Sequence, residues 1–479
     1  MTHWRAALSW LWGYHVYLTE YLQKISDRIT EWSVWQNFRL ITSEVPTSGS
    51  IFGFAEYLSA LALFLVVMTV SDFRFRYRLS LTRIDLRRVG FGLGFGVGAA
   101  VLAIDVWFQN GLPIPRVFAN PNNLKAALAL VFLIFVFHVI SVAVIRPPTF
   151  TKANAKQFFE ASYHFIHEGN PDRLQTIAEE LRRPLESIIT AAAEVPRVSD
   201  KVDNKTTWRE ADYAASFLLL IGDRRFCKIV VDKVPAFAFA CFQSVQRHPL
   251  ARLPIFQFAR NIGQEFVRNT SSSFYQEDSG YHSGLVGYTQ PATKIIFGSY
   301  EFVEKCAADG DSPLDTDYRD LDEFNETQMG GYSRASLAFL ESYLKATKGQ
   351  PSPHSYALAR MLHSFESSLS EVYRINGLDD FSKASAYGRL RVTADFSKDA
   401  INLASKYMTR PRRIRSSEEM PKDFLDELAQ LIFEMIFAAS AVSSPDWTAW
   451  WIQHNTVWNT ITGLGRNETQ KIVAFKVNA

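Results

Sequence analysis

Three ionisable side chains, Glu56, Asp105 and His138, lie within long apolar runs of the sequence. Such groups are costly inside a membrane and often mark ion or proton pathways. At about 1.5 Å per helical residue, Glu56 and Asp105 lie roughly 7 and 5 Å from one end of their runs. The two acids are therefore predicted to share a level and to form an acidic ring at a pore mouth, unless they are solvated or paired with Arg116. His138 lies about 18 Å from the corresponding end of its run, and we expect a hydrogen-bonded packing residue rather than a proton relay.

A second group is the arginine cluster of the segment RPRRIR. It comprises Arg410, Arg412, Arg413 and Arg415. Guanidinium groups suit phosphates, and aromatic side chains beside them would stack the bases of single-stranded nucleic acid. The aromatic candidates are Trp447, Trp451 and Trp458, which share one helical face. The sequence thus predicts a nucleotide or single-stranded nucleic-acid ligand. A solvated or lipid-contacting loop for the arginines, and a buried helix seam for the tryptophans, remain alternatives.

No enzyme signature is found in the sequence. Residues 271–291 gather Glu277, Asp278 and His282 among glycines and tyrosines, but one histidine near two acids is usually structural. No serine, cysteine or lysine lies in a recognised nucleophile motif. The acidic segment 309–327 resembles a calcium loop in composition only, because its spacing does not match the EF-hand pattern, and we expect a solvated loop. The three cysteines match no metal spacing and fit a reducing compartment. We therefore expect no catalytic residue, no metal and no cofactor.

The stretch GFGLGFGVGAA has a glycine at every second position. These residues are Gly90, Gly92, Gly94, Gly96 and Gly98. On a helix they form two ribbons about 200° apart, and small residues at four-residue spacing let membrane helices approach closely. One ribbon is expected to pack within the protomer and the other against a neighbouring copy. Packing inside one three-helix bundle is the alternative. Neither a dinucleotide fingerprint nor a phosphate loop matches this stretch.

Three apolar runs must position these residues. They comprise residues 51–70, 89–108 and 126–145. Each has about the 20 residues that cross a bilayer core as a helix. The remaining sequence after residue 146 shows helical periodicity and little strand-like alternation. The predicted fold class is therefore an all-α membrane protein, with a three-span N-terminal transmembrane bundle (51–146) and a mainly helical cytoplasmic domain (147–479).

The charges of the loops predict the direction of the spans. The loop 71–88 contains six arginines, whereas the loop 109–125 contains only two basic residues. Because positively charged loops stay in the cytoplasm, the first loop and everything after residue 146 are predicted to be cytoplasmic. Residues 1–50 would then be extracytoplasmic or interfacial, with an amphipathic N-terminal helix. A fourth span over residues 4–22 is the alternative.

The long cytoplasmic part is expected to consist of packed helices. A helix pair is predicted to join at Gly169 and Asn170. The polar segments 196–208 and 309–327 are predicted linkers that would subdivide this domain. The apolar segment 424–442 is interrupted by polar residues, Gln430 and Glu434 among them, so we expect a buried helix rather than a further span. The formal net charge of +2 over 479 residues gives no global attraction to nucleic acid.

This layout resembles the membrane effectors of bacterial anti-phage systems, in particular that of the Hailong system. The resemblance is architectural and rests on the spans within 51–145, followed by a large helical domain with arginine and tryptophan elements and no enzyme motif. It implies a homo-oligomeric channel or pore effector in the bacterial inner membrane, controlled by a nucleotide or oligonucleotide. The alternative hypothesis is a non-conducting membrane anchor whose helical domain binds a cytosolic partner protein.

Overall fold

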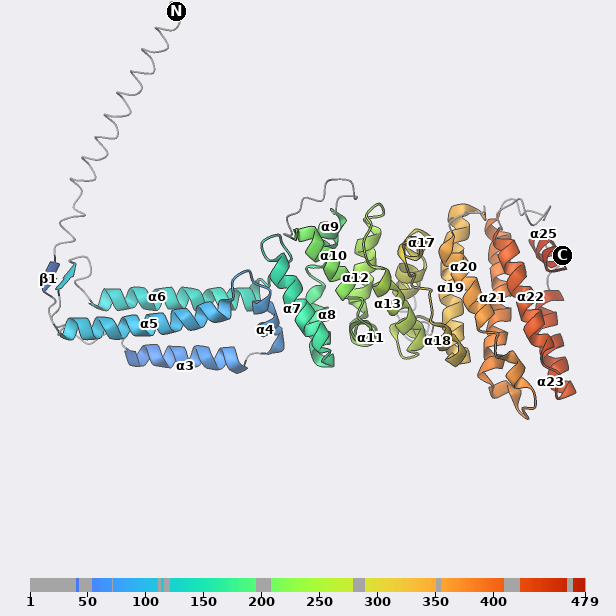
Figure 1. Cartoon of the computed structure of the whole chain (residues 1–479), viewed down its shortest axis with the longest axis horizontal. Coiled ribbons are helices and arrows are strands. Elements are labelled where there is room, and N and C mark those ends of the chain that lie inside the picture. The colour runs from blue at the N-terminus through green and yellow to red at the C-terminus, as the bar shows by residue number, and fades with distance from the viewer. Residues whose placement is uncertain are drawn as a thin grey trace, which may run out of the picture. The chain divides into compact units, whose positions relative to one another are not determined.

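A computed structural model describes most of the chain. The described residues are 40–42, 54–70, 72–110, 113–115, 121–194, 208–278, 289–349, 355–408, 423–462 and 468–478. The chain divides into two compact units, Met1–Pro148 and Thr149–Ala479. Apart from one pair of three-residue strands, the regular elements of the described residues are helices (Figure 1). The all-helical part of the predicted fold class is therefore confirmed.

The first unit contains three long helices that lie side by side (Figure 1). They are α3 (Phe54–Val70), α5 (Leu86–Gln109) and α6 (Pro121–Ile140), and α6 continues as the π-helical turn η2 (Ser141–Ile145). The shorter α4 (Phe73–Ser80) connects α3 to α5, and β1 (Leu40–Thr42) pairs antiparallel with β2 (Pro113–Pro115). Because β2 lies in the connection between α5 and α6, the chain that precedes α3 reaches that same end of the bundle.

Two helices among the described residues are long and apolar enough to cross a membrane. They are Leu86–Gln109 and Pro121–Ile145, and they correspond to the second and third predicted spans. The first predicted span forms a helix of 17 residues, whose apolar part Phe54–Val66 is shorter than this requirement. The three-span bundle is therefore not confirmed. Only 28% and 17% of the apolar windows of α5 and α6 are buried, so neither helix is enclosed as the core helix of a soluble protein would be.

Two apolar clusters hold the helices of the first unit together. Towards the connection between α5 and α6, Tyr57 packs against Val97 and Val101 of α5. At the opposite end, Leu79 from α4 and Leu86 from α5 pack against the last turns of α6 and η2. Helix α4 is thereby fixed across the end of the α5–α6 pair.

The second unit is a succession of short and medium helices, which pack mainly against near neighbours along the chain (Figure 1). Its first half contains α7 (Ala155–Glu168), α8 (Pro171–Leu181), α9 (Leu185–Ala193), α10 (Glu210–Leu220), α11 (Arg224–Lys233), α12 (Pro235–Gln246), α13 (Phe256–Arg268), α14 (Ser273–Asp278), η3 (Ala292–Phe297) and α17 (Tyr300–Asp309). Its second half contains α18 (Tyr318–Glu323), α19 (Glu326–Thr347), α20 (Tyr356–Ser367), η4 (Val372–Ile375), η5 (Phe381–Lys383), α21 (Ser385–Tyr407), α22 (Phe424–Ser440), α23 (Asp446–Trp450), η6 (Trp451–Trp458), α24 (Asn459–Thr462) and α25 (Glu468–Asn478).

The junction between α7 and α8 shows how local sequence sets these helices. Gly169 ends α7 in the left-handed region, with φ of 73°, where a side chain would be strained. The side chain of Asn170 then accepts hydrogen bonds from the backbone N–H groups of Asp172 and Arg173, which caps α8. The predicted helix pair is confirmed here. Helix α22 is likewise a packed helix, with Leu425, Leu428 and other apolar residues buried.

Several predicted features lie outside the described residues. They are the amphipathic N-terminal helix, the segment 196–208 apart from Trp208, the histidine at 282, and the arginine cluster of Arg410, Arg412, Arg413 and Arg415.

Candidate functional site

The first glycine ribbon of α5 is filled within the protomer. Gly90, Gly94 and Gly98 are buried. A methyl group placed on Gly98 would lie 2.6 Å from Cε1 of Tyr57, and one on Gly94 would lie 3.0 Å from Cδ1 of Leu61. The hydroxyl of Tyr57 donates a hydrogen bond to the carbonyl of Gly94. These glycines therefore let α3 pack directly on the backbone of α5.

The second ribbon of α5 is open. Gly92 and Gly96 are exposed, and a methyl group on either would meet nothing within 4 Å. Phe95, which lies between them in sequence, is 78% exposed. Packing within one protomer therefore accounts for only one of the two predicted ribbons. The other leaves a smooth groove along α5, which we call the glycine groove, defined by Gly92 and Gly96.

The two acids predicted at a pore mouth do not share a level. Tyr57, the residue after Glu56, lies against Gly94 and Gly98. Asp105 is seven residues beyond Gly98, which corresponds to about 10 Å along α5. The sequence-based depths of Glu56 and Asp105 were measured from the ends of their apolar runs. In the structure, the contact of Tyr57 with Gly94 and Gly98 determines how α3 is aligned along α5. Glu56, an exposed residue in the first turn of α3, thus lies deeper along α5 than Asp105 does.

Asp105 is paired within the protomer. Its carboxylate forms an ion pair with the ammonium group of Lys125, a residue of α6 that is 5% exposed. The sequence placed Lys125 in a loop and named Arg116 as the alternative partner. Helix α6 begins earlier, at Pro121, so Lys125 lies in its second turn and faces α5. His138 is exposed on α6, so it is not a packing residue of this protomer.

Replacement of Lys125 by methionine should destabilise the bundle by about 2 kcal/mol, because the Asp105 carboxylate would lose its partner. A fully buried carboxylate would cost more, but Asp105 is about one-third exposed. Thermal unfolding in detergent would measure the change. The double variant Lys125→Met with Asp105→Asn should regain most of the loss. Equal unfolding temperatures for the wild type and Lys125→Met would contradict the claim that the ion pair of Lys125 and Asp105 stabilises the bundle.

Tryptophans of α23 and η6 form an exposed aromatic surface, which we call the tryptophan surface: Trp447, Trp450, Trp451 and Trp458. Trp447 is 63% exposed and stacks on Trp450, with ring centroids 5.1 Å apart. Trp450 in turn stacks on His454, also at 5.1 Å. The interpretation of these residues as a buried seam is therefore wrong. The opposite face of η6, with Ile452 and Val457, is the one that packs inward.

The flank of the arginine cluster lies away from the tryptophan surface. The indole N–H of Trp451 donates to the hydroxyl of Tyr387, 3.4 Å away, near the start of α21. Met408, which directly precedes the undescribed segment, follows the other end of this 23-residue helix, about 30 Å along its axis. Met408 thus lies at the opposite end of α21 from Tyr387, and the four arginines that follow it lie outside the described residues.

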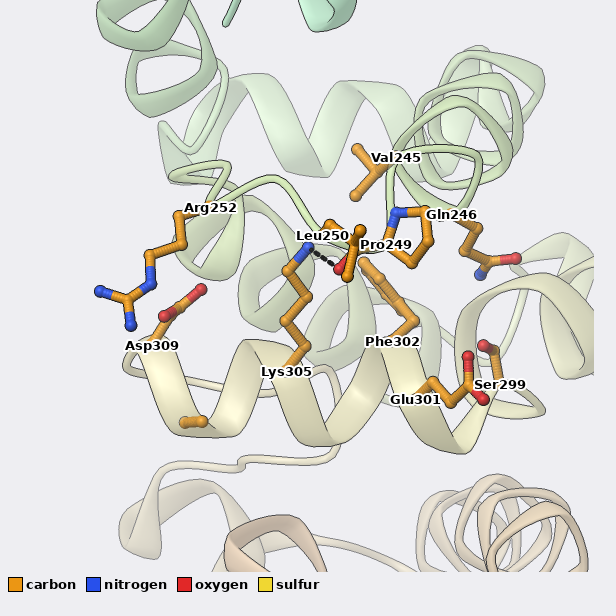
Figure 2. A pocket seen from close by; sticks show the side chains of 11 residues that line it. Val245, Gln246, Pro249, Leu250, Arg252, Ser299, Glu301, Phe302, Lys305 and Asp309 are labelled. Carbon is orange, nitrogen blue, oxygen red and sulfur yellow. Dashed lines mark hydrogen bonds between the residues drawn. The ribbon is translucent and has the colours of Figure 1, made fainter. Parts of the chain in front are cut away.

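A cavity of about 390 Å³ opens beside the end of α12 and along α17 (Figure 2). Its polar wall contains the cations Arg252 and Lys305 and the acids Glu301 and Asp309, around an apolar floor that includes Phe302. The ammonium group of Lys305 donates to two backbone carbonyls after α12, the nearer at 2.9 Å. Partial burial lowers the pKa of Lys305. Sequence reasoning missed this cavity because its walls come from segments about 50 residues apart.

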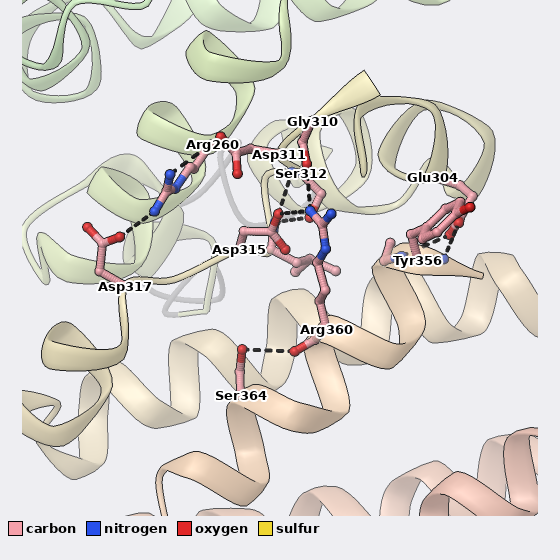
Figure 3. A network of polar contacts seen from close by, with 12 residues as sticks. Arg260, Glu304, Gly310, Asp311, Ser312, Asp315, Asp317, Tyr356, Arg360 and Ser364 are labelled. Carbon is pink, nitrogen blue, oxygen red and sulfur yellow. Dashed lines mark hydrogen bonds and ion pairs between the residues drawn. The ribbon is translucent and has the colours of Figure 1, made fainter. Parts of the chain in front are cut away.

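The acidic segment 309–327 is neither a linker nor a solvated loop (Figure 3). Arg360 donates to the carboxylate of Asp315 at 2.9 Å and to the carbonyl of Gly310 at 2.6 Å. Arg260 forms ion pairs with Asp317 and one further aspartate. Apolar side chains of the segment, Leu314 among them, are buried. Its carboxylates therefore fix the chain between α17 and α19 by pairing with arginines.

Glu277, the central acid of the segment 271–291, has a structural role. Its carboxylate accepts hydrogen bonds from the backbone N–H of Ala292 at 2.6 Å and of Thr293 at 3.1 Å. Burial raises its pKa, although these hydrogen bonds oppose the shift. Asp278 ends α14, and His282 lies outside the described residues.

No protein-family model, curated protein or solved structure matches this chain. Two features of the described residues bear on function: the apolar and glycine-grooved surface of the first unit, and the tryptophan surface of the second.

Proposed function

We propose that this protein is a homo-oligomeric channel or pore effector of the bacterial inner membrane, regulated through its helical unit by a nucleotide or oligonucleotide in anti-phage defence. The observation that carries the proposal is the surface of the first unit. Helices α5 and α6 expose most of their apolar side chains, including Phe95 and Phe137. Contiguous apolar surfaces of this kind mark contact with lipid or with another protein.

In this proposal α3 is a third span. The pairing of β1 with β2 supports it, because the chain enters α3 from the end of the bundle that holds the α5–α6 connection. The 17 residues of α3 extend about 25 Å, and a bilayer adapts to a short span by local thinning. The arginine-rich α4 end then faces the cytoplasm by the charge rule. The helical unit, which follows η2 at this end, would be cytoplasmic.

The glycine groove supports the oligomer. Because Gly92 and Gly96 have no neighbour within 4 Å, a helix from another copy can approach this face of α5 closely. Of the two acids proposed for the pore, Glu56 in the first turn of α3 would supply a ring of negative charge towards the outer end of that span. Asp105 would contribute less, because Lys125 neutralises it.

Planar bilayers containing the purified full chain test the channel. We expect discrete current steps that change when nucleotides extracted from the native cells are added. Substitution of Glu56 by glutamine should reduce selectivity for cations over anions, and Glu160→Gln, an exposed acid of the helical unit, is the control. Replacing Arg410, Arg412, Arg413 and Arg415 by glutamine should abolish the response to nucleotide and leave the basal steps. A silent bilayer that contains correctly oriented protein would rule out the channel.

The tryptophan surface favours a second candidate function, a non-conducting anchor that binds a cytosolic partner protein. Exposed tryptophans are enriched among the residues that dominate protein interfaces. This candidate predicts a stably co-purified protein that is lost when Trp447 and Trp450 are replaced by alanine. Trp208→Ala, another exposed tryptophan of the helical unit, should leave that partner bound.

A further inference from the structure

We propose that the α4 end of the first unit is a binding site for the headgroups of anionic phospholipids. This inference rests on the proposed function only in requiring that α5 and α6 cross a bilayer. The site comprises residues 72–88.

The charge of this segment is strongly one-sided. Its arginines are Arg74, Arg76, Arg78, Arg83, Arg87 and Arg88, against only two aspartates. Asp85 is engaged locally: it caps α5 by accepting from the backbone N–H groups of Arg87 and Arg88, and it pairs with the Arg88 side chain at 3.0 Å. The guanidinium groups of Arg76, Arg83 and Arg87 project from exposed residues. A phosphate at this end would therefore meet an excess of cations.

The arginines are held at a fixed level. Arg78 donates a hydrogen bond of 2.7 Å to the carbonyl of Ala143 in η2, which joins α4 to the end of α6. Leu79 and Leu86 pack against Val139 of α6 and against η2 from the same side. Because α4 and the first turn of α5 are both packed in this way, Arg76 and Arg87 cannot move far along the bundle axis.

Exposed apolar residues beside the arginines identify the ligand. Ile84 is 58% exposed and Val89 is 42% exposed, and both lie within a few residues of Arg83 and Arg87. Free phosphate or a nucleic acid would leave these side chains in water. A phospholipid satisfies both parts, since its headgroup meets the guanidinium groups while its acyl chains cover the apolar residues. Each juxtamembrane arginine contributes roughly fivefold to the affinity for an anionic membrane surface.

Equilibrium binding of short-chain phosphatidylglycerol and phosphatidylcholine to the delipidated full chain in neutral detergent tests the site. We expect tighter binding of phosphatidylglycerol. The triple variant Arg76→Gln, Arg83→Gln and Arg87→Gln should lose this preference by on the order of a hundredfold in affinity. The same positions changed to lysine should retain most of it. The control variant carries glutamine at three exposed arginines of the helical unit, Arg182, Arg183 and Arg209. It should bind both lipids as the wild type does.

Three results would overturn the lipid site. They are equal affinity for the two lipids, an unaffected glutamine variant with an unchanged unfolding temperature, and full displacement of phosphatidylglycerol by inorganic phosphate at matched concentration. Conductance in neutral bilayers separates this inference from the channel. A silent bilayer with a retained lipid preference would remove the channel alone, and conductance without any lipid preference would remove the lipid site alone.

Discussion

Leucine in place of Gly98 is expected to prevent α3 from packing on α5. The first added carbon already lies 2.6 Å from Tyr57, whose ring is 1% exposed and cannot move into free space. Overpacking a buried site costs about 1–3 kcal/mol for a few methylene groups, and a complete leucine side chain here should reach or exceed about 3 kcal/mol. Loss of the Tyr57 hydrogen bond to Gly94 would add to this cost. A large fall in the unfolding temperature in detergent is the expected measurement.

Leucine at Gly96 is the matched control for this prediction. The same side chain is added two residues away, where nothing lies within 4 Å, so the protomer should unfold at nearly the wild-type temperature. If the glycine groove contacts another copy, Gly96→Leu should instead shift the particle mass in detergent towards the monomer. If both substitutions destabilised the protein equally, the claim that one glycine ribbon is packed within the protomer and the other is open would be refuted. An unchanged oligomer in Gly96→Leu would refute the groove as an interface.

Methionine in place of Lys476 is expected to release α25 from α22. The ammonium group is 2% exposed and binds the carboxylate of Asp423 at 3.1 Å and that of Asp426. Breaking such a buried pair costs about 3–5 kcal/mol, since the carboxylates remain behind without a cation. Limited proteolysis should then cleave the C-terminal helix earlier than in the wild type. Lys471→Met, on the exposed side of the same helix, should be cleaved at the wild-type rate.

The pH dependence of this contact should reverse in Lys476→Met. For Asp426, burial raises the pKa, but the hydrogen bond and charge of Lys476, together with hydrogen bonds from Asp423, outweigh burial and leave the pKa below the ordinary 3.8. A lowered pKa contributes stability that is present above 3.8 and lost as the pH falls through the folded value. Burial raises the pKa of Asp423. This residue therefore removes stability as the pH rises, whereas Asp426 adds it. Without Lys476, both carboxyls are buried acids that favour protonation, and α25 should bind more tightly on acidification. If α25 of the Lys476→Met variant instead detached more easily at acidic pH, this account of Asp423 and Asp426 would be contradicted.

Sequence reasoning succeeds here where a local rule decides the structure. The left-handed glycine and the capping asparagine of the α7–α8 junction depend only on neighbouring residues. The lengths of the apolar runs are enough to predict α5 and α6.

Sequence reasoning fails where the position of a residue depends on how segments far apart in the chain are aligned. The level of Glu56 depends on Tyr57 meeting the glycines of α5, and the pairing of Asp105 depends on where α6 begins. Tryptophan spacing identified a shared face but not whether it turns inward, which the π-helical geometry of η6 and its packing determine. Acids of the segment 309–327 looked solvated because their arginine partners, Arg260 and Arg360, come from other helices.

The unequal surroundings of the two faces of α5 have a kinetic consequence. Since the contacts of Gly98 with α3 are satisfied within one chain, folding of the bundle is a first-order process that needs no partner. Association through the glycine groove, as proposed, would then be a separate step of higher order in protein. A channel assembled this way would stay absent at low copy number and appear steeply as the density of chains in the membrane rises, so expression level alone would act as a threshold.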